Sequence, residues 1–261
     1  AEPTAEVLAD SRVEVLHGDP RALITEHQSA SWDLVFVAVG DPDNGATNRL
    51  YTTDFYRTLI EAMSPEGVLV TRATAGANFM GPELAAFGGS MLSSLEDAFS
   101  DVALAAGDPV RFYSSPGLGV VSSDPQTLAQ RHASLPNSGG VPPQAFFSLV
   151  DPERVEFVKE VYSRAALGDT TLLNSDNRPL SLTLGLLVQS RFTGNSWAAL
   201  VGGVQAAGVW LWWIPLAVFF FLRSHRFMAQ PEESEERGWL SWWLLTAAGF
   251  SGLSLGVLLL F

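Results

Sequence analysis

Cysteine is absent from this chain, and its absence removes two classes of site. Without thiols the chain forms neither a disulfide bond nor a metal site with thiolate ligands. Histidine is scarce, and no two histidines have the spacing typical of metal ligands in the set His17, His27, His132 and His225. No serine lies in the pattern of a nucleophile elbow. The sequence therefore predicts no metal site and no serine hydrolase.

Positive charge is also in short supply. The chain has 15 Lys and Arg against 28 Asp and Glu, which gives a net charge of −13 at pH 7. An acidic protein repels the phosphate backbone, so we expect no nucleic-acid partner. The negative charge either keeps the protein in solution or attracts a basic partner.

The N-terminus lacks the features of a signal peptide, because its first ten residues contain neither a basic start nor an apolar run. The chain also lacks an initiator Met, and its last residues, 257–261, are apolar. We expect it to be a fragment or a processed piece of a longer polypeptide.

Long uncharged runs, by contrast, are present in the last third of the chain. Residues 196–222 and 239–261 contain no charged residue, and each run exceeds the roughly 20 apolar residues that a membrane-spanning helix needs. Trp197 and Trp239 lie near the ends of these runs, where indole rings favour the membrane interface. The alternative is a pair of buried helices, but such long uncharged runs are rare in water-soluble folds. We expect two transmembrane helices, joined by the polar connector 223–238 into an antiparallel hairpin.

The first 185 residues alternate short apolar strands with helical patterns. The predicted strands are 12–17, 33–39, 67–71, 102–105 and 118–122, and the predicted helices are 21–28, 53–63, 82–99 and 151–164. This alternation is typical of a doubly wound α/β sheet, and the apolar run 33–39 indicates a strand buried on both faces. Ligands in such folds bind beyond the carboxyl ends of the strands. The loops at 18–19 and 40–45 are therefore the places where chemistry is expected.

At these loops the sequence resembles the spermidine synthase family, the polyamine aminopropyltransferases, and in particular the bacterial type fused to membrane helices. Four stretches carry the resemblance, and they are RVEVLHGD at 12–19, the DP and NRLYTTDFY of 33–56, PEGVLV at 65–70 and NSDNRP at 174–179. The resemblance implies a Rossmann-like, methyltransferase-type sheet over residues 1–185, whose first strands we expect to lie upstream. It also implies location in a bacterial inner (cytoplasmic) membrane, with the lipid bilayer and other membrane helices or subunits as partners.

The family transfers an aminopropyl group from decarboxylated S-adenosylmethionine to an amine. By resemblance, Asp19 matches the acidic residue on the adenine side, Asp41 the second Asp of the family's D-x-x-D-P loop, and Tyr51 lies in the segment matching the substrate site. The residues alone leave other roles open. Asp19 is equally suited to cap a helix, Asp41 to form a turn, and Tyr51 to pack a helix onto the sheet.

Two departures from the family pattern concern catalysis. The first Asp of D-x-x-D-P, the family's proposed base, falls on Ala38, and an alanine neither accepts a proton nor binds an ammonium group. The Gly-rich nucleoside loop is also absent from the chain. We therefore expect a catalytically degenerate accessory or structural subunit of a membrane complex, without a certain cofactor. The alternative is an active membrane-bound aminopropyltransferase that uses decarboxylated S-adenosylmethionine as co-substrate, with Asp41 as its base.

Overall fold

The computed structural model describes residues 7–27, 31–76, 79–136, 140–166 and 172–193, together with 217, 218 and 221. The chain divides into two compact units, Ala1–Gln189 and Ser190–Phe261. The elements described below lie in the first unit, apart from the last residues of its final helix. The predicted domain bounds at 185, 196–222, 223–238 and 239–261 stay predictions.

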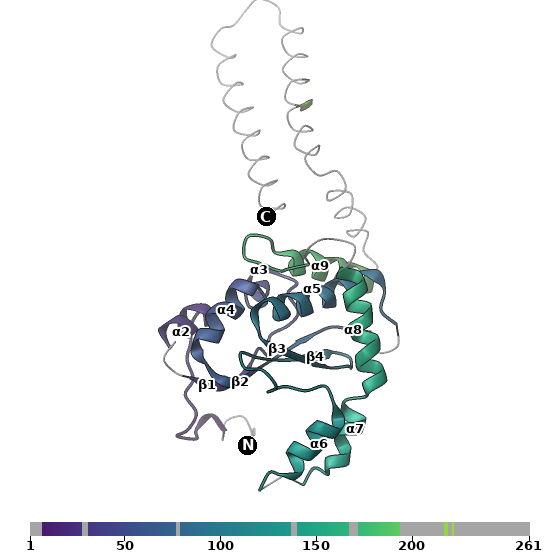
Figure 1. Ribbon diagram of the computed structural model, residues 1–261. Coiled ribbons are helices and arrows are strands. Elements are labelled where there is room, and N and C mark those ends of the chain that lie inside the picture. The colour runs from purple at the N-terminus through teal and green to yellow at the C-terminus, as the bar shows by residue number, and fades with distance from the viewer. Residues whose placement is uncertain are drawn as a thin grey trace, which may run out of the picture. The chain divides into compact units, whose positions relative to one another are not determined.

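Four strands form one mixed sheet in the order β1-β2-β4-β3 (Figure 1). The strands are β1 (Trp32–Phe36), β2 (Met63–Ala73), β3 (Asp101–Ala105) and β4 (Val110–Ser115). β1 and β2 are parallel, whereas β4 runs antiparallel to both β2 and β3. The parallel pair places the ends of β1 and β2 at the same edge, where a α/β sheet binds its ligands. The mixed sheet with its helices fits a Rossmann-like, methyltransferase-type fold.

Helices cover one face of this sheet and bury its core. α4 (Thr53–Ala62) begins where the Thr52 hydroxyl accepts a hydrogen bond from the backbone N–H of Phe55 at 3.2 Å. Phe55 and Leu59 lie on its inner side and are almost completely buried. α5 (Pro82–Ala98) packs against both α4 and α8 (Pro152–Ala166), as Figure 1 shows. The other helical segments are α2 (Pro20–Glu26), α3 (Gly45–Asn48), α6 (Pro125–Ala133), η1 (Pro143–Ala145), α7 (Phe146–Leu149) and α9 (Leu180–Thr193).

The opposite face of the sheet is only partly covered. Side chains alternate along β2, so that Leu69 is buried against the helices while Val68 and Val70 point to the other side. On that side α6 and α7 lie over the β3–β4 half of the sheet. Leu34 and Phe36 of β1 stay 55% and 64% exposed. The predicted burial of β1 on both faces is therefore wrong, because no described helix covers this half.

Several predicted elements differ from the structure for a common reason. The predicted strands 12–17 and 118–122 are irregular, since neither pairs with a strand in the described part of the chain. The strand that completes the sheet is β4, which the sequence did not indicate. The predictions of helices at 21–28, 53–63, 82–99 and 151–164 are confirmed with ends shifted by a few residues.

The predicted transmembrane hairpin requires correction. Among the described residues, none of the helices combines the length and the apolar character that crossing a membrane demands. The last of them, α9, has 14 residues and includes Gln189 and Arg191, whereas a span requires about 20 apolar residues. The fold thus gives no support to the hairpin or to the inner-membrane location. The two runs on which the hairpin was placed lie outside the described residues, except for 217, 218 and 221.

Candidate functional site

The loop that follows β1 carries two of the residues singled out by the sequence. Ala38 lies two residues beyond the end of β1, and Asp41 follows in the turn toward α3. The Oδ1 atom of Asp41 accepts a hydrogen bond from the backbone N–H of Thr74 at 3.1 Å. Since Thr74 directly follows β2, this bond joins the carboxyl ends of the two parallel strands. Asp41 therefore holds the edge of the sheet together at the place where a ligand is expected.

Tyr51 reaches the same loop from the segment before α4. Its side chain is completely buried, and its hydroxyl donates a hydrogen bond to the carbonyl oxygen of Gly40 at 3.0 Å. Burial, to which the charge of Asp41 adds, raises the pKa of the Tyr51 phenol to about 12. The phenol is thus a neutral hydrogen-bond donor at physiological pH, and it fixes the loop against the helix layer.

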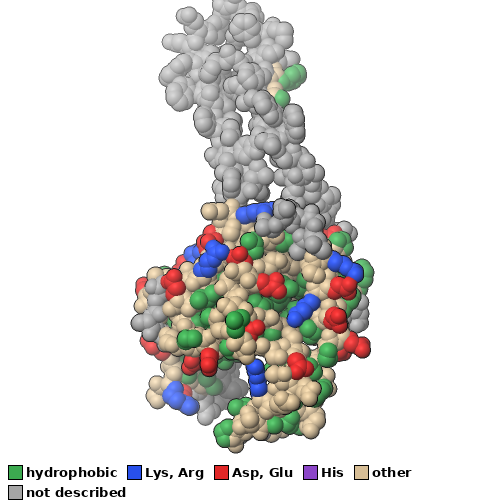
Figure 2. All heavy atoms as spheres, viewed as in Figure 1, with side chains coloured by type: hydrophobic (Ala, Val, Ile, Leu, Met, Phe, Trp, Pro, Cys, Tyr) green, Lys and Arg blue, Asp and Glu red, His purple; other side chains and the backbone are tan. Residues whose placement is uncertain are grey.

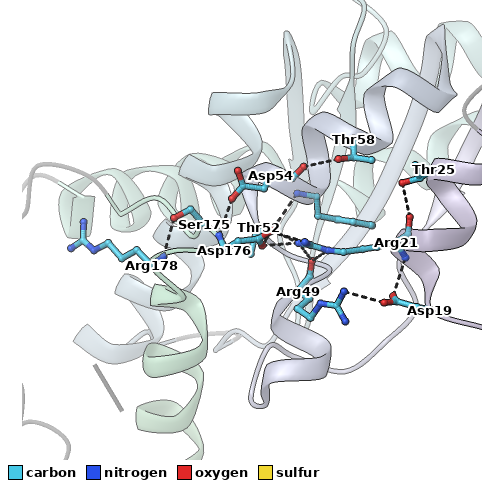
Figure 3. Close-up of polar contacts among 11 residues, drawn as sticks. Asp19, Arg21, Thr25, Arg49, Thr52, Asp54, Thr58, Ser175, Asp176 and Arg178 are labelled. Carbon is cyan, nitrogen blue, oxygen red and sulfur yellow. Dashed lines mark hydrogen bonds and ion pairs between the residues drawn. The ribbon is translucent and has the colours of Figure 1, made fainter. Parts of the chain in front are cut away.

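Asp19 lies at the start of α2. Its carboxylate accepts a hydrogen bond from the backbone N–H of Arg21 at 3.1 Å, which makes it the N-cap of the helix. Its other oxygen forms an ion pair with Arg49 at 3.0 Å (Figure 3). The backbone hydrogen bond, with the Arg49 bond second to it, lowers the pKa of the Asp19 carboxyl. The helix-cap role that the sequence left open is therefore observed, while the adenine contact stays a prediction.

Arg21 lies at the centre of a polar cluster that the sequence did not reveal (Figure 3). Its guanidinium binds both carboxylate oxygens of Asp176, at 2.6 and 2.7 Å, and donates to the Thr52 hydroxyl at 2.7 Å and to the Arg49 carbonyl at 2.9 Å. The face of the Phe55 ring lies beneath it, 5.7 Å from the guanidinium carbon. The hydrogen bond from Arg21 lowers the pKa of Asp176. This two-pronged pair joins α2 to the 174–179 segment across the start of α4.

Asn174 anchors the same segment from the inside and is completely buried. Its side-chain amide donates to the carbonyl oxygen of Tyr51 at 2.9 Å and to the side-chain oxygen of Asn48 at 3.1 Å. Its side-chain oxygen accepts from the backbone N–H of Ser181 at 3.1 Å. The NSDNRP run thereby fixes the backbone on which Tyr51 is carried. The sequence offered one indication of this role, namely the resemblance of the NSDNRP run to a family motif. None of its residues was predicted as a site residue.

The structure thus brings Asp41 and Tyr51 to one end of the sheet and ties Asp19 into the neighbouring Arg21 cluster. Within the described ranges, no group of three His, Asp or Glu side chains lies close enough to hold a metal ion. The carboxylates of this region are engaged in bonds that hold loops and helix ends.

Comparison with known proteins assigns the family. The model described as the spermine/spermidine synthase domain matches residues 2–131. This chain belongs to the spermidine synthase family. The resemblance drawn from the four sequence stretches is therefore confirmed at the level of the family.

Curated relatives match a short part of the chain. The polyamine aminopropyltransferase of Oceanobacillus iheyensis is 37% identical over 68 residues, which cover 26% of this chain and 13% of that protein. The polyamine aminopropyltransferase of Thermoanaerobacter sp. (strain X514) is 34% identical over 68 residues, 24% of its own length. Polyamine aminopropyltransferase 2 of Streptomyces coelicolor is 36% identical over 64 residues, 12% of its length. The matched part thus spans about a quarter or less of these proteins.

Among solved structures, a probable spermidine synthase from Corynebacterium glutamicum ATCC 13032 is 16% identical to this family member. The superposition covers 55% of this chain and 53% of that chain with a TM-score of 0.35.

Proposed function

We propose that this member of the spermidine synthase family does not transfer aminopropyl groups and serves instead as a binding or assembly module. The observation that carries the proposal is Ala38. It occupies the position just beyond β1 at which the resemblance implies a carboxylate base. An amine attacks a sulfonium carbon only as the free base, so the reaction needs a group that accepts its proton. A methyl side chain at this position supplies none.

The carboxylates near Ala38 also favour a structural role. Asp41 accepts the backbone hydrogen bond from Thr74, and Asp19 caps α2 while it pairs with Arg49. A base that waits for an amine needs a carboxylate oxygen directed toward the ligand. The protein instead engages both oxygens of Asp19 and the Oδ1 atom of Asp41. These polar groups stabilise the fold. Such a site is consistent with an accessory function in which another subunit is the partner.

The second candidate is an active aminopropyltransferase with decarboxylated S-adenosylmethionine as co-substrate. One observation favours it, namely the hydrogen bond of the Tyr51 hydroxyl to the carbonyl oxygen of Gly40, the residue directly before Asp41, at the carboxyl end of β1. In this alternative the Oδ2 atom of Asp41 accepts the proton of the amine, while Oδ1 keeps its bond to Thr74.

Turnover distinguishes the two candidates. The full chain would be incubated with decarboxylated S-adenosylmethionine and an aliphatic diamine, and methylthioadenosine would be quantified by mass spectrometry. We expect no product above the protein-free background. Product that disappears in the Asp41→Asn variant would overturn the proposal in favour of the active enzyme.

A gain-of-function variant sharpens this test. Ala38→Asp restores a carboxylate beyond β1, and Ala133→Asp adds the same charge at the exposed end of α6 as a matched control. Turnover by Ala38→Asp alone would identify the missing carboxylate as the cause of inactivity. If the wild type and Ala38→Asp formed product at the same measurable rate, the importance assigned to this position would be contradicted.

A further inference from the structure

Two arginines face each other on the partly covered side of the sheet. Arg72 of β2 and Arg111 of β4 are direct partners in the antiparallel ladder, so their side chains leave the same face next to each other. Both residues are exposed. Within the described part of the chain, neither guanidinium forms a hydrogen bond or an ion pair. Like charges in this arrangement destabilise a sheet. An exposed pair of this kind, without a partner among the described residues, is available to an external anion.

The arginine pair borders a hollow of about 630 Å³ over β1, β2 and β4. Leu34 and Phe36 of β1 and Val70 of β2 form its apolar floor, and Ala38 closes it at the carboxyl end of β1. The ladder sets Phe36 beside Val70, one row from the arginines. A hollow of this volume lies in the range of small-molecule sites, which combine apolar walls with a few polar groups.

The charge of the hollow is opposite to that of the chain. The protein has 28 acidic residues, and acidic side chains are spread over the face seen in Figure 2. Yet the lining of the hollow contains two arginines and no carboxylate. The other polar side chains of the lining are neutral, namely the buried Thr71 and the half-buried Tyr113, which lies beside Val70 in the ladder. Two adjacent guanidinium groups repel a protonated amine and attract an anion.

We propose that this hollow binds a small organic anion. Its carboxylate or phosphate group lies between Arg72 and Arg111, whose planar forks each offer two parallel N–H donors to such a group. Its apolar or aromatic body lies on Leu34, Phe36 and Val70. The inference goes beyond the proposed function and is independent of it, because anion binding here requires neither the presence nor the absence of aminopropyl transfer.

A pair of fluorescent dyes with similar apolar bodies tests the proposal on the full chain. Anilinonaphthalene sulfonate carries an anionic group, and N-phenylnaphthylamine does not. We expect the wild type to bind the sulfonate at least about tenfold more tightly, since each charge-assisted contact is equivalent to about one order of magnitude in affinity. The double variant Arg72→Gln/Arg111→Gln should lose this preference and should still bind the uncharged dye within about twofold.

Matched variants assign the effect to the pair. Arg164→Gln, which removes an exposed arginine on α8, should leave both affinities unchanged. Arg111→Lys keeps the charge and loses the fork, so its preference should be intermediate. Circular dichroism of each variant should match the wild type, because both side chains are exposed and their replacement removes repulsion. Competition by benzoate and by phenyl phosphate then identifies the preferred anionic group.

Three results would overturn the proposal. The first is equal affinity of the wild type for the two dyes, and the second is a preference that survives in the double variant. The third is the absence of binding by both dyes, which would mean that another polypeptide segment or a second copy of the chain covers the hollow. None of these results depends on the turnover assay, so the failure of one proposal is separable from the failure of the other.

Discussion

Replacement of Asn174 by alanine should destabilise the domain strongly. The side chain is completely buried and makes three hydrogen bonds, to Tyr51, Asn48 and Ser181. All three partners are themselves buried, so each loses its bond where water does not replace it. At about 1 kcal/mol for each buried group left without a partner, the free energy of unfolding should fall by about 3 kcal/mol.

Urea unfolding followed by far-ultraviolet circular dichroism measures this loss. With a dependence of about 2 kcal/mol per molar urea, the midpoint should shift down by about 1.5 M. Asn44→Ala is the matched control, since this exposed asparagine caps α3 by accepting from the backbone N–H of Thr47 at 3.0 Å. The loss of such a cap typically costs about 1 kcal/mol. If Asn174→Ala cost no more than this control, the assigned role of the buried amide would be refuted.

Three further changes test the packing and the polar cluster. In a double-mutant cycle of Arg21→Ala and Asp176→Ala, unfolding at pH 7 should give a coupling free energy of about 1–2 kcal/mol. Because Arg21 lowers the pKa of Asp176, this coupling should be complete above the carboxyl's ordinary pKa of about 4 and disappear as the pH falls through the lowered value; a coupling near zero at pH 7 would contradict the pair. Tyr56→Phe should raise the free energy of unfolding by about 1 kcal/mol, since the buried hydroxyl has no hydrogen-bond partner among the described residues, and a lower melting temperature would refute this reasoning. Gly88→Ala should cost about 2–3 kcal/mol, as the new Cβ would lie 2.1 Å from the ring of Tyr162, and an unchanged melting temperature would show that α5 and α8 can move apart.

The helices were predictable because their signals are local. In α4, Phe55 and Leu59 are four residues apart and share the buried side, and in α5 a proline stands at the first position of the helix. The strands were harder, since a strand exists only where a neighbour pairs with it. Residues 12–17 have the alternation but no partner strand among the described residues, whereas β4 pairs with both β2 and β3 and places Arg111 at an exposed position of its alternation.

In the candidate site, too, the features that depend on neighbouring residues were predictable, and those that depend on distant residues were not. The cap formed by Asp19 and the packing of Tyr51 follow from their immediate neighbours, and both were among the roles left open by the sequence. The Arg21–Asp176 pair joins residues that are 155 positions apart, and no spacing rule connects them. The exposure of Leu34 and Phe36 likewise depends on which helices cover the sheet. An apolar strand has the same sequence pattern whether or not its second face is covered.

The long separation within the polar cluster has a consequence for the order of folding during synthesis. A ribosome adds roughly 5–20 residues per second, and domains fold as their segments emerge. After Arg21 has been made, the partner carboxylate of Asp176 follows 155 positions later, which corresponds to roughly 8–30 s. During that interval α2 and α4 can form, but the 174–179 segment that binds them together has not yet been synthesised. The bonds that fix the loops around Asp19 and Tyr51 to the 174–179 segment therefore form only after this segment has been made, when the strands of the sheet have already been synthesised.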